Sequence, residues 1–268
     1  MSFFADLFGS IFGGKKKAAP VVAAAVGPTI GFTSEIAKKV TGSGQVGYTA
    51  PIGDGLGIHG EPLAREVGYS APTKKSPSKY RVKFYTGGYL NRQACANEDH
   101  AICFVSHHFN SDGSKKADYA LCVVAKNASD RSKVWAADYV VRISDAFVVP
   151  RWNGNGVCVG GMGGRGDSQI RHTAMPAILC EPLFCSNPHR AEQIRSESGR
   201  LELARCLVES IRETFPDGGL VAFSVGHKYK LGSHRHDRGA AVHGGGTEAD
   251  YAEMVLDAAA EMLQEGIT

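Results

Sequence analysis

The sequence lacks long hydrophobic runs and a dominant charge. No stretch reaches the roughly 18 consecutive apolar residues that a membrane-spanning helix needs. Basic and acidic residues number 30 and 27, so the formal net charge is only +3, and the two signs are dispersed along the chain. Proteins that bind nucleic acid through its phosphates usually carry a concentrated basic surface. The composition therefore predicts no transmembrane segment and no nucleic-acid partner.

Paired cysteine motifs are also missing. The seven cysteines are an odd number, none has CxxC spacing, and several lie in apolar runs such as "AICFV" and "ALCVV". We interpret them as buried thiols of a protein that folds in a reducing cytosol. The first residues lack the basic region of a secretory signal peptide, so we expect synthesis in the cytoplasm without such a signal.

Residues 1–78 and 79–268 differ in composition. The first segment is rich in Gly, Ala, Pro, Ser and Thr and has few long apolar periods, as expected of an extension or linker. Within it, the hydrophobic residues from Phe3 to Phe12 recur on one helical face, followed by Lys15–Lys17. This face would dock on another protein or lie on a membrane surface. A frayed tail is the alternative.

From Lys79 onward, short apolar runs alternate with helical periods, which predicts an α/β domain. The nearly continuous apolar runs favour strands that are covered on both faces, as in a mostly parallel sheet with helices on each side. The predicted strands cover 80–86, 101–110, 119–126, 176–184 and 219–225, and the predicted helices cover 90–98, 129–147, 198–215 and 247–264. Thr247 is the expected N-cap of the last helix.

Several of these elements end in side chains that bind metals or transfer protons. His227 follows one apolar strand, the adjacent His107 and His108 end another, and Glu181 ends a third, while Glu248 begins the last helix. A catalytic zinc uses three protein ligands and keeps a position for water. An ionised carboxylate at the end of a buried strand costs free energy unless it is paired with another group or takes part in binding or catalysis. The pattern predicts a metal hydrolase.

Four segments together resemble the zinc-dependent N-acetylmuramoyl-L-alanine amidases. "FVSHHFNS" is similar to the family's SxHxN segment, and "MPAILCEPLFCSN" to its PxxLxExxFxSN run, while "YRVKFYTGGYLNRQACAN" resembles the strand and helix before that histidine. The family's opening motif is instead similar to "VAFSVGHKYKLGSHRHDRGAAVHGGGTEADY", near the C-terminus. The resemblance implies a twisted, largely parallel sheet and a circular permutation with new ends near Lys79 and Gly266. Close surface termini make such a permutation possible.

The resemblance also implies roles for particular residues. Zinc would be held by His227, Glu248 and His108, with Glu181 as the general base. His108 is selected over His107 because successive strand residues face opposite ways. Arg171 matches the place of a basic residue near the substrate, with a surface arginine as its alternative, and Ser106 and Asn110 would support His108 or contact substrate.

Other histidines and acidic residues of the chain offer alternatives to these roles. His59, with Glu61 or Glu66, is the rival for the first ligand, although no apolar strand leads into it. Asp237 and Arg238 depart from the family's Asp-Pro, which affects loop geometry rather than the ligands. His234, His236 and His243 are expected to be exposed, and residues 150–169 would form either a flap or an ordinary long loop.

The expected activity is hydrolysis of the amide between N-acetylmuramic acid and L-alanine in peptidoglycan, at the cell wall. An enzyme made in the cytoplasm that acts outside the membrane suggests a bacteriophage lysin, either free or carried in the virion. Two alternatives remain: a zinc peptidase or deacylase for another amide, and a catalytically silent structural or wall-binding virion protein.

Overall fold

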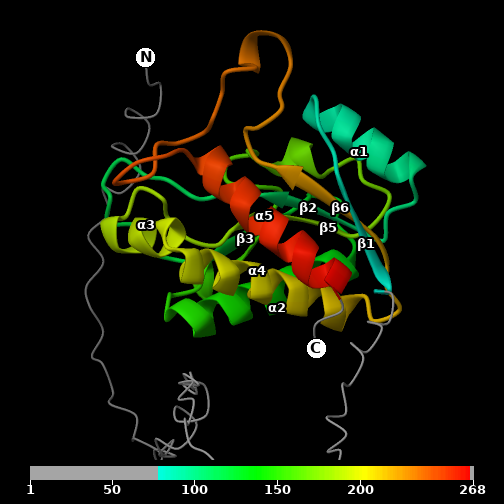
Figure 1. Ribbon diagram of the computed structural model, residues 1–268, viewed down its shortest axis with the longest axis horizontal. Coiled ribbons are helices and arrows are strands. Elements are labelled where there is room, and N and C mark those ends of the chain that lie inside the picture. The colour runs from blue at the N-terminus through cyan, green and yellow to red at the C-terminus, as the bar shows by residue number, and fades with distance from the viewer. Residues whose placement is uncertain (1–77, 266–268) are drawn as a thin grey trace, which may run out of the picture. The chain divides into compact units, whose positions relative to one another are not determined.

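A six-stranded sheet with the order β1-β6-β2-β5-β3-β4 forms the centre of the protein in the computed structural model, which describes residues 78–265 (Figure 1). The predicted N-terminal extension lies outside the described residues, apart from Ser78. The strands are β1 (Tyr80–Phe84), β2 (Cys103–His107), β3 (Leu121–Val124), β4 (Val157–Val159), β5 (Ala177–Glu181) and β6 (Gly219–Val225).

The direction of the strands places the carboxyl ends of β6, β2 and β5 along one edge. β1, β6, β2 and β5 are parallel to one another, whereas β3 is antiparallel to β5 and parallel to β4. The register pairs His107 with both Val225 of β6 and Cys180 of β5. The residues that follow these three strands therefore lie next to one another, although they are far apart in the sequence.

Helices cover both faces of the sheet. The larger core layer contains residues of α2 (Asp130–Phe147), α4 (Glu197–Thr214) and α5 (Glu248–Glu265), and α3 (Pro188–Arg195) joins α4 at this side. The other face carries α1 (Tyr89–Glu98) and the short 3-10 helix η3 (Asp167–Gln169). The expected α/β fold, with a mostly parallel sheet between helices, is confirmed. Two more 3-10 helices are η2 (Trp152–Gly154) and η4 (Gly232–His234).

The start of α5 illustrates how local sequence positions a site residue. The Thr247 hydroxyl accepts a hydrogen bond from Asp250 N at 3.4 Å, and the Asp250 carboxylate accepts one from Thr247 N at 3.1 Å. This reciprocal pair satisfies amide groups that a helix start leaves without partners. Thr247 is thus the N-cap, as the sequence predicts, and Glu248 is held in the first turn.

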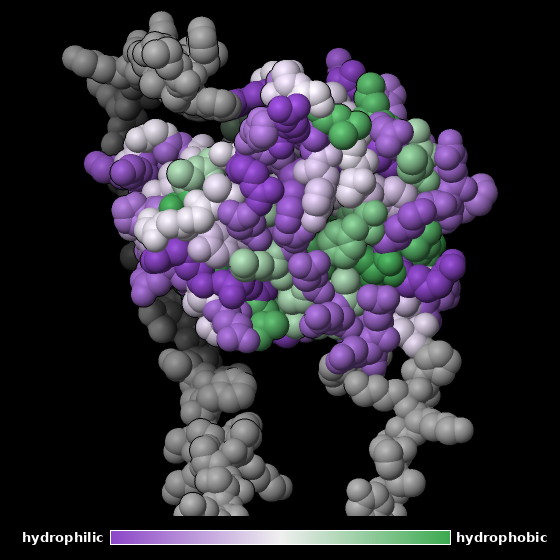
Figure 2. All heavy atoms as spheres, turned by 45° about the horizontal axis from the view of Figure 1, so that its top comes forward, coloured by the Kyte–Doolittle hydropathy of each residue, from purple (hydrophilic) through white to green (hydrophobic). Residues whose placement is uncertain are grey.

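Several elements differ from the sequence-based expectations. β4 and the hairpin after it occupy part of 150–169, which was expected to be a long loop or a flap, and α3 was not predicted. β4 was missed because it has only 3 residues and lies among glycines. No helix of residues 78–265 is both long and apolar enough to cross a bilayer. Figure 2 shows polar residues over most of the visible face, with hydrophobic residues in smaller groups between them.

Candidate active site

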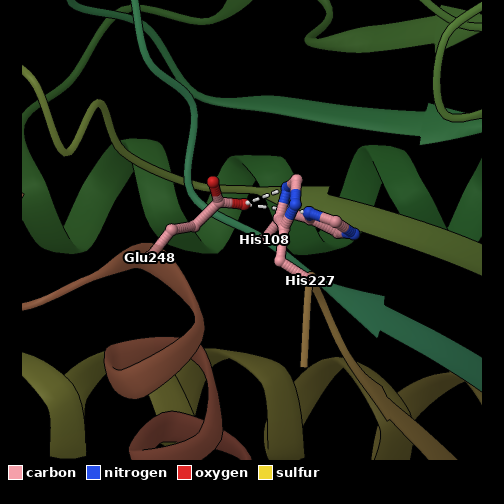
Figure 3. A group of neighbouring side chains, drawn as sticks. All are labelled: His108, His227 and Glu248. Carbon is pink, nitrogen blue, oxygen red and sulfur yellow. Dashed lines mark hydrogen bonds and ion pairs between the residues drawn. The ribbon is translucent and has the colours of Figure 1, made fainter. Parts of the chain in front are cut away.

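His108, His227 and Glu248 converge at the edge where β2 and β6 end and α5 begins (Figure 3). One potential ligand atom from each residue lies within 4.8 Å of the others. Glu248 Oε1 is 2.9 Å from His108 Nδ1 and 3.3 Å from His227 Nε2. Residues from three separated segments therefore form one cluster of two imidazoles and a carboxylate, as predicted for the metal ligands.

The Glu248 carboxylate is buried and has several donors around it. Phe109 N donates to Oε1 at 3.3 Å, and Ala240 N donates to Oε2 at 3.1 Å. Burial raises the pKa of Glu248, but hydrogen bonds and charge from His108 and His227 outweigh burial and lower the pKa well below its usual range. The carboxylate is therefore ionised at neutral pH and suited to bind a cation.

His227 is held in an unusual backbone conformation. Its φ is 58°, in the left-handed region, and its backbone N–H donates to the Tyr89 hydroxyl at 3.0 Å. Nδ1 lies 3.1 Å from the Asp237 carboxylate, which leaves Nε2 directed to Glu248. Burial lowers the pKa of His227, but the bonds to Glu248 and Asp237 outweigh burial, so the net shift is upward. A carboxylate on the second ring nitrogen orients a metal-binding histidine.

Arg92 of α1 stabilises the backbone on both sides of His227. Its fully buried guanidinium donates to Gly87 O at 2.9 Å, to Ser224 Oγ at 2.9 Å and to Val225 O at 2.8 Å, and it also reaches Lys228 O. These acceptors lie on both sides of His227 in the sequence. Arg92 thus connects α1 to the backbone that carries this ligand.

His108 is oriented by Gln169 of η3. Gln169 Oε1 lies 2.9 Å from His108 Nε2 and accepts a hydrogen bond from Ser106 Oγ at 3.2 Å. An amide oxygen can only accept, so His108 Nε2 is the donor of this hydrogen bond, while Nδ1 faces the Glu248 carboxylate. Ser106 therefore supports His108 through Gln169, where direct local support was expected. Sequence reasoning missed Gln169, because nothing local to it points to a site.

Glu181 ends β5 at the same edge. The backbone N–H of His108 donates to Cys180 O at 2.9 Å. Glu181 is the next residue after Cys180, so its backbone neighbour is hydrogen-bonded to a candidate ligand. Glu181 is half-buried. Burial raises its pKa, the nearby His108, Arg165 and His227 oppose this, and the net shift is upward. A carboxyl group with a raised pKa beside a metal cluster fits proton transfer.

The remaining histidines fall into two groups. His107 is fully buried, packs against Phe109 with ring centroids 5.2 Å apart, and does not belong to the cluster, in line with the choice of His108. His234, His236 and His243 are exposed, as expected. His59, Glu61 and Glu66 lie outside the described residues.

Two residues that were expected near the substrate, Arg171 and Asn110, contact other parts of the protein in this structure. Arg171 forms an ion pair with Asp167 and lines a cavity with Pro176 and Ala177, at the opposite end of β5 from Glu181. The side chain of Asn110 accepts from Ser111 N at 2.8 Å. Its backbone pairs with Phe184 beyond the end of β5.

An α/β domain with two histidines and a glutamate at the ends of parallel strands, and a second glutamate beside them, belongs to the class of candidate metal-dependent hydrolases. The family model described as Amidase_3, N-acetylmuramoyl-L-alanine amidase, matches residues 74–213, which is more than half of the chain. The chain belongs to this family. The match contains His108 and Glu181 but ends before His227 and Glu248. A comparison with curated proteins finds no significant match.

Solved amidase structures are similar to part of the chain. The catalytic domain of CwlV, an N-acetylmuramoyl-L-alanine amidase from Bacillus (Paenibacillus) polymyxa var. colistinus, has 25% identity and a TM-score of 0.41. An N-acetylmuramoyl-L-alanine amidase from Clostridium difficile 630 has 25% identity and a TM-score of 0.42. Each similarity covers 48% of this chain and 66% of the other chain. The chain thus spans slightly less than two thirds of these relatives.

Proposed function

We propose that the protein is a peptidoglycan hydrolase that cleaves the amide between N-acetylmuramic acid and L-alanine. The observation that carries the proposal is the convergence of His108, His227 and Glu248 beside Glu181, in a chain of the N-acetylmuramoyl-L-alanine amidase family. The family supplies the substrate, whereas the cluster supplies the means of hydrolysing an amide.

The three clustered residues fit a zinc ion. Two imidazoles and one carboxylate are a known ligand set of catalytic zinc, and it leaves a position for water or substrate. Glu248 is ionised, and the hydrogen bond from His108 Nε2 to Gln169 leaves Nδ1 of His108 facing the carboxylate, so both side chains can direct a ligand atom toward one ion. When bound there, zinc would polarise the scissile carbonyl and make water a stronger nucleophile.

Glu181 would move the protons. As a carboxylate it accepts a proton from the attacking water, and as a carboxylic acid it donates that proton to the amine of L-alanine as the C–N bond breaks. Its raised pKa favours the second step, because the protonated form is more accessible than in an exposed glutamate. During the reaction, Asp237 would keep His227, and Gln169 would keep His108, in the tautomer that binds the metal.

Circular permutation accounts for the order of the motifs in the sequence. The family match ends at residue 213, yet β6 inserts between β1 and β2, and α5 packs on β1. The Ser78 hydroxyl donates to Leu263 O, so the two ends of the described domain lie together. Adjacent ends allow the chain to be reopened at this point without moving the core. We therefore propose that β6 and α5 correspond to the family's usual opening strand and helix.

Delivery to the cell wall is a further part of the proposal. The hydrophobic residues of 1–14 would attach the enzyme to a virion or membrane surface, as in a phage lysin. The support is the helical spacing of these residues in the sequence. Deletion of residues 1–14 would then reduce association with phage particles or vesicles, and unchanged association would refute this role.

Mass spectrometry of soluble products tests the activity. Purified, zinc-loaded protein is incubated with peptidoglycan beside the His227→Ala variant. Stem peptides with a free N-terminal L-alanine, released by the wild type alone, would support both the reaction and the ligand. Products cut at another amide would favour the peptidase or deacylase alternative. Absence of release by the wild type would favour a wall-binding protein, and an active variant would direct attention to His59.

A further inference from the structure

The segment that joins β6 to α5 carries two residues of the site and extends away from the edge of the sheet (Figure 1). His227 is the second residue after β6, and Asp237 lies on the returning part of the segment, beyond η4. Lys230 joins these two parts, because its Nζ lies 2.5 Å from Asp237 Oδ2. This ion pair ties the segment together next to a candidate metal ligand.

Lys230 has a second fixed partner in Tyr89, the first residue of α1. Its Nζ lies over the Tyr89 ring, 5.3 Å from the ring centroid. An ammonium group at this distance is attracted to the face of an aromatic ring, and the attraction is stronger where water is excluded. Only 17% of the Lys230 side chain is exposed. A carboxylate and an aromatic ring therefore hold this side chain in one place, instead of leaving its charged end in solvent as on most surface lysines.

The two partners of Lys230 both contact His227. The Tyr89 hydroxyl accepts a hydrogen bond from the backbone N–H of His227 at 3.0 Å, and the Asp237 carboxylate lies 3.1 Å from its Nδ1. Four contacts thus form a closed circuit through Tyr89, His227, Asp237 and Lys230. One partner holds the backbone of His227 and the other holds its imidazole, and Lys230 connects the two.

Asp237 also connects His227 to the backbone around the carboxylate ligand. Its Oδ1 accepts a hydrogen bond from Gly239 N at 2.9 Å, and the next residue, Ala240, donates from its backbone N–H to Glu248 Oε2 at 3.1 Å. The position of the Asp237 carboxylate therefore affects His227 and the backbone that supports Glu248. The Asp237 side chain is 34% exposed, so without an ion-pair partner it could turn toward water.

We propose that Lys230 is a positioning residue of the metal site. It holds the Asp237 carboxylate against Nδ1 of His227, and so keeps this imidazole in the orientation in which Nε2 faces Glu248. Lys230 acts through Asp237 and would not touch the ion itself. Side chains that orient metal-binding histidines in this way contribute about 10- to 100-fold to metal affinity. This inference rests on the proposed zinc site, and it makes a lysine outside the ligand set a determinant of how tightly zinc binds.

The zinc Kd of the full-length protein, measured by competition with a chelator of known affinity, tests the proposal. Lys230→Met removes the charge and keeps most of the length of the side chain, and Lys228→Met is the matched control. Lys228 lies on the same segment, its side chain is 18% exposed, and it pairs with Glu253 of α5 and lies 4.8 Å from the Tyr229 ring centroid. We expect Lys230→Met to weaken zinc binding about 10-fold or more. Lys230→Arg should recover most of the affinity, and Lys228→Met should change it less than about 2-fold.

A double-mutant cycle tests whether Lys230 acts through Asp237. In an Asp237→Asn background, Lys230→Met should change the zinc Kd less than about 2-fold, because the carboxylate that Lys230 holds is already gone. An unchanged Kd in Lys230→Met alone, an equal loss in Lys228→Met, or the same loss in both backgrounds would overturn the proposal. Zinc binding needs no substrate, so this outcome is separate from the amidase assay. If the wild type binds zinc but does not cleave peptidoglycan, only the proposed function fails; if it binds no zinc, this inference fails as well.

Discussion

Gly239 lies directly against the carboxylate of Glu248. A Cβ atom at position 239 would come within 2.5 Å of Glu248 Oε2 and 2.8 Å of His227 Cδ2, and Gly239 has a φ of 73°. Any larger residue would have to displace one of two candidate metal ligands. The glycine is thus a spatial requirement of the cluster as well as a backbone one.

We expect Gly239→Ala to weaken zinc binding about 10-fold or more, because the added methyl group separates Glu248 from His227. Competition with a chelator of known affinity measures the zinc Kd. Gly232→Ala is the matched control, since Gly232 also has a positive φ of 65° but nothing lies within 4 Å of its Cβ position. Equal losses in the two variants would attribute the effect to backbone strain and contradict the steric explanation.

Substitution of the proposed general base should affect chemistry and leave the metal cluster in place. Glu181→Gln keeps the shape of the side chain but removes its ability to accept a proton, so we expect kcat to fall by about 10²- to 10⁴-fold. Zinc content, measured by atomic emission, should stay near that of the wild type. A variant that retains more than a tenth of the wild-type kcat would exclude Glu181 as the base.

The buried guanidinium of Arg92 predicts a link between α1 and zinc binding. Arg92→Met would leave backbone carbonyls on both sides of His227 without a donor, at a cost of about 1–3 kcal/mol for each buried group that stays unsatisfied. We expect a free energy of unfolding lower by at least about 2 kcal/mol in urea titrations, together with weaker zinc binding. The exposed Arg81→Met should change neither quantity. Unchanged zinc affinity in a destabilised Arg92→Met would limit Arg92 to a structural role.

His107 should reduce stability in acid. Burial, followed by the neighbouring His108, lowers the pKa of His107 to about 3, and neither ring nitrogen has a hydrogen-bond partner in the described part of the chain. The folded protein keeps this ring neutral, whereas the unfolded chain takes up a proton below a pKa of about 6.5. Stability from this residue is therefore present above about pH 6.5 and is lost progressively as pH falls toward about 3.

His107→Leu is expected to equal or exceed the wild type in stability at pH 8, because a buried polar ring without partners is replaced by an apolar side chain of similar size. The difference in free energy of unfolding between His107→Leu and the wild type should be larger at pH 5 than at pH 8 by about 2 kcal/mol, because the folded and unfolded pKa values of His107 differ. Thermal unfolding at both pH values measures it, with the exposed His243→Leu as the control. A difference in Tm that does not depend on pH would contradict the assignment.

Local sequence determined much of the fold and the identity of the clustered residues. The apolar runs that became β2, β5 and β6, the helical stripe of α5 and its cap at Thr247 depend on periodicity and on neighbours a few residues away. The polar residues at the ends of these elements were recognisable for the same reason. The family motifs then indicated which of them belong together.

Tertiary structure decided what depends on contacts between distant segments. The antiparallel direction of β3, the hydrogen bond between Gln169 and His108, and the four acceptors around Arg92 join residues far apart in the sequence. Periodicity reports which face of an element is buried, whereas the neighbour across that face is chosen by the packing of the whole chain.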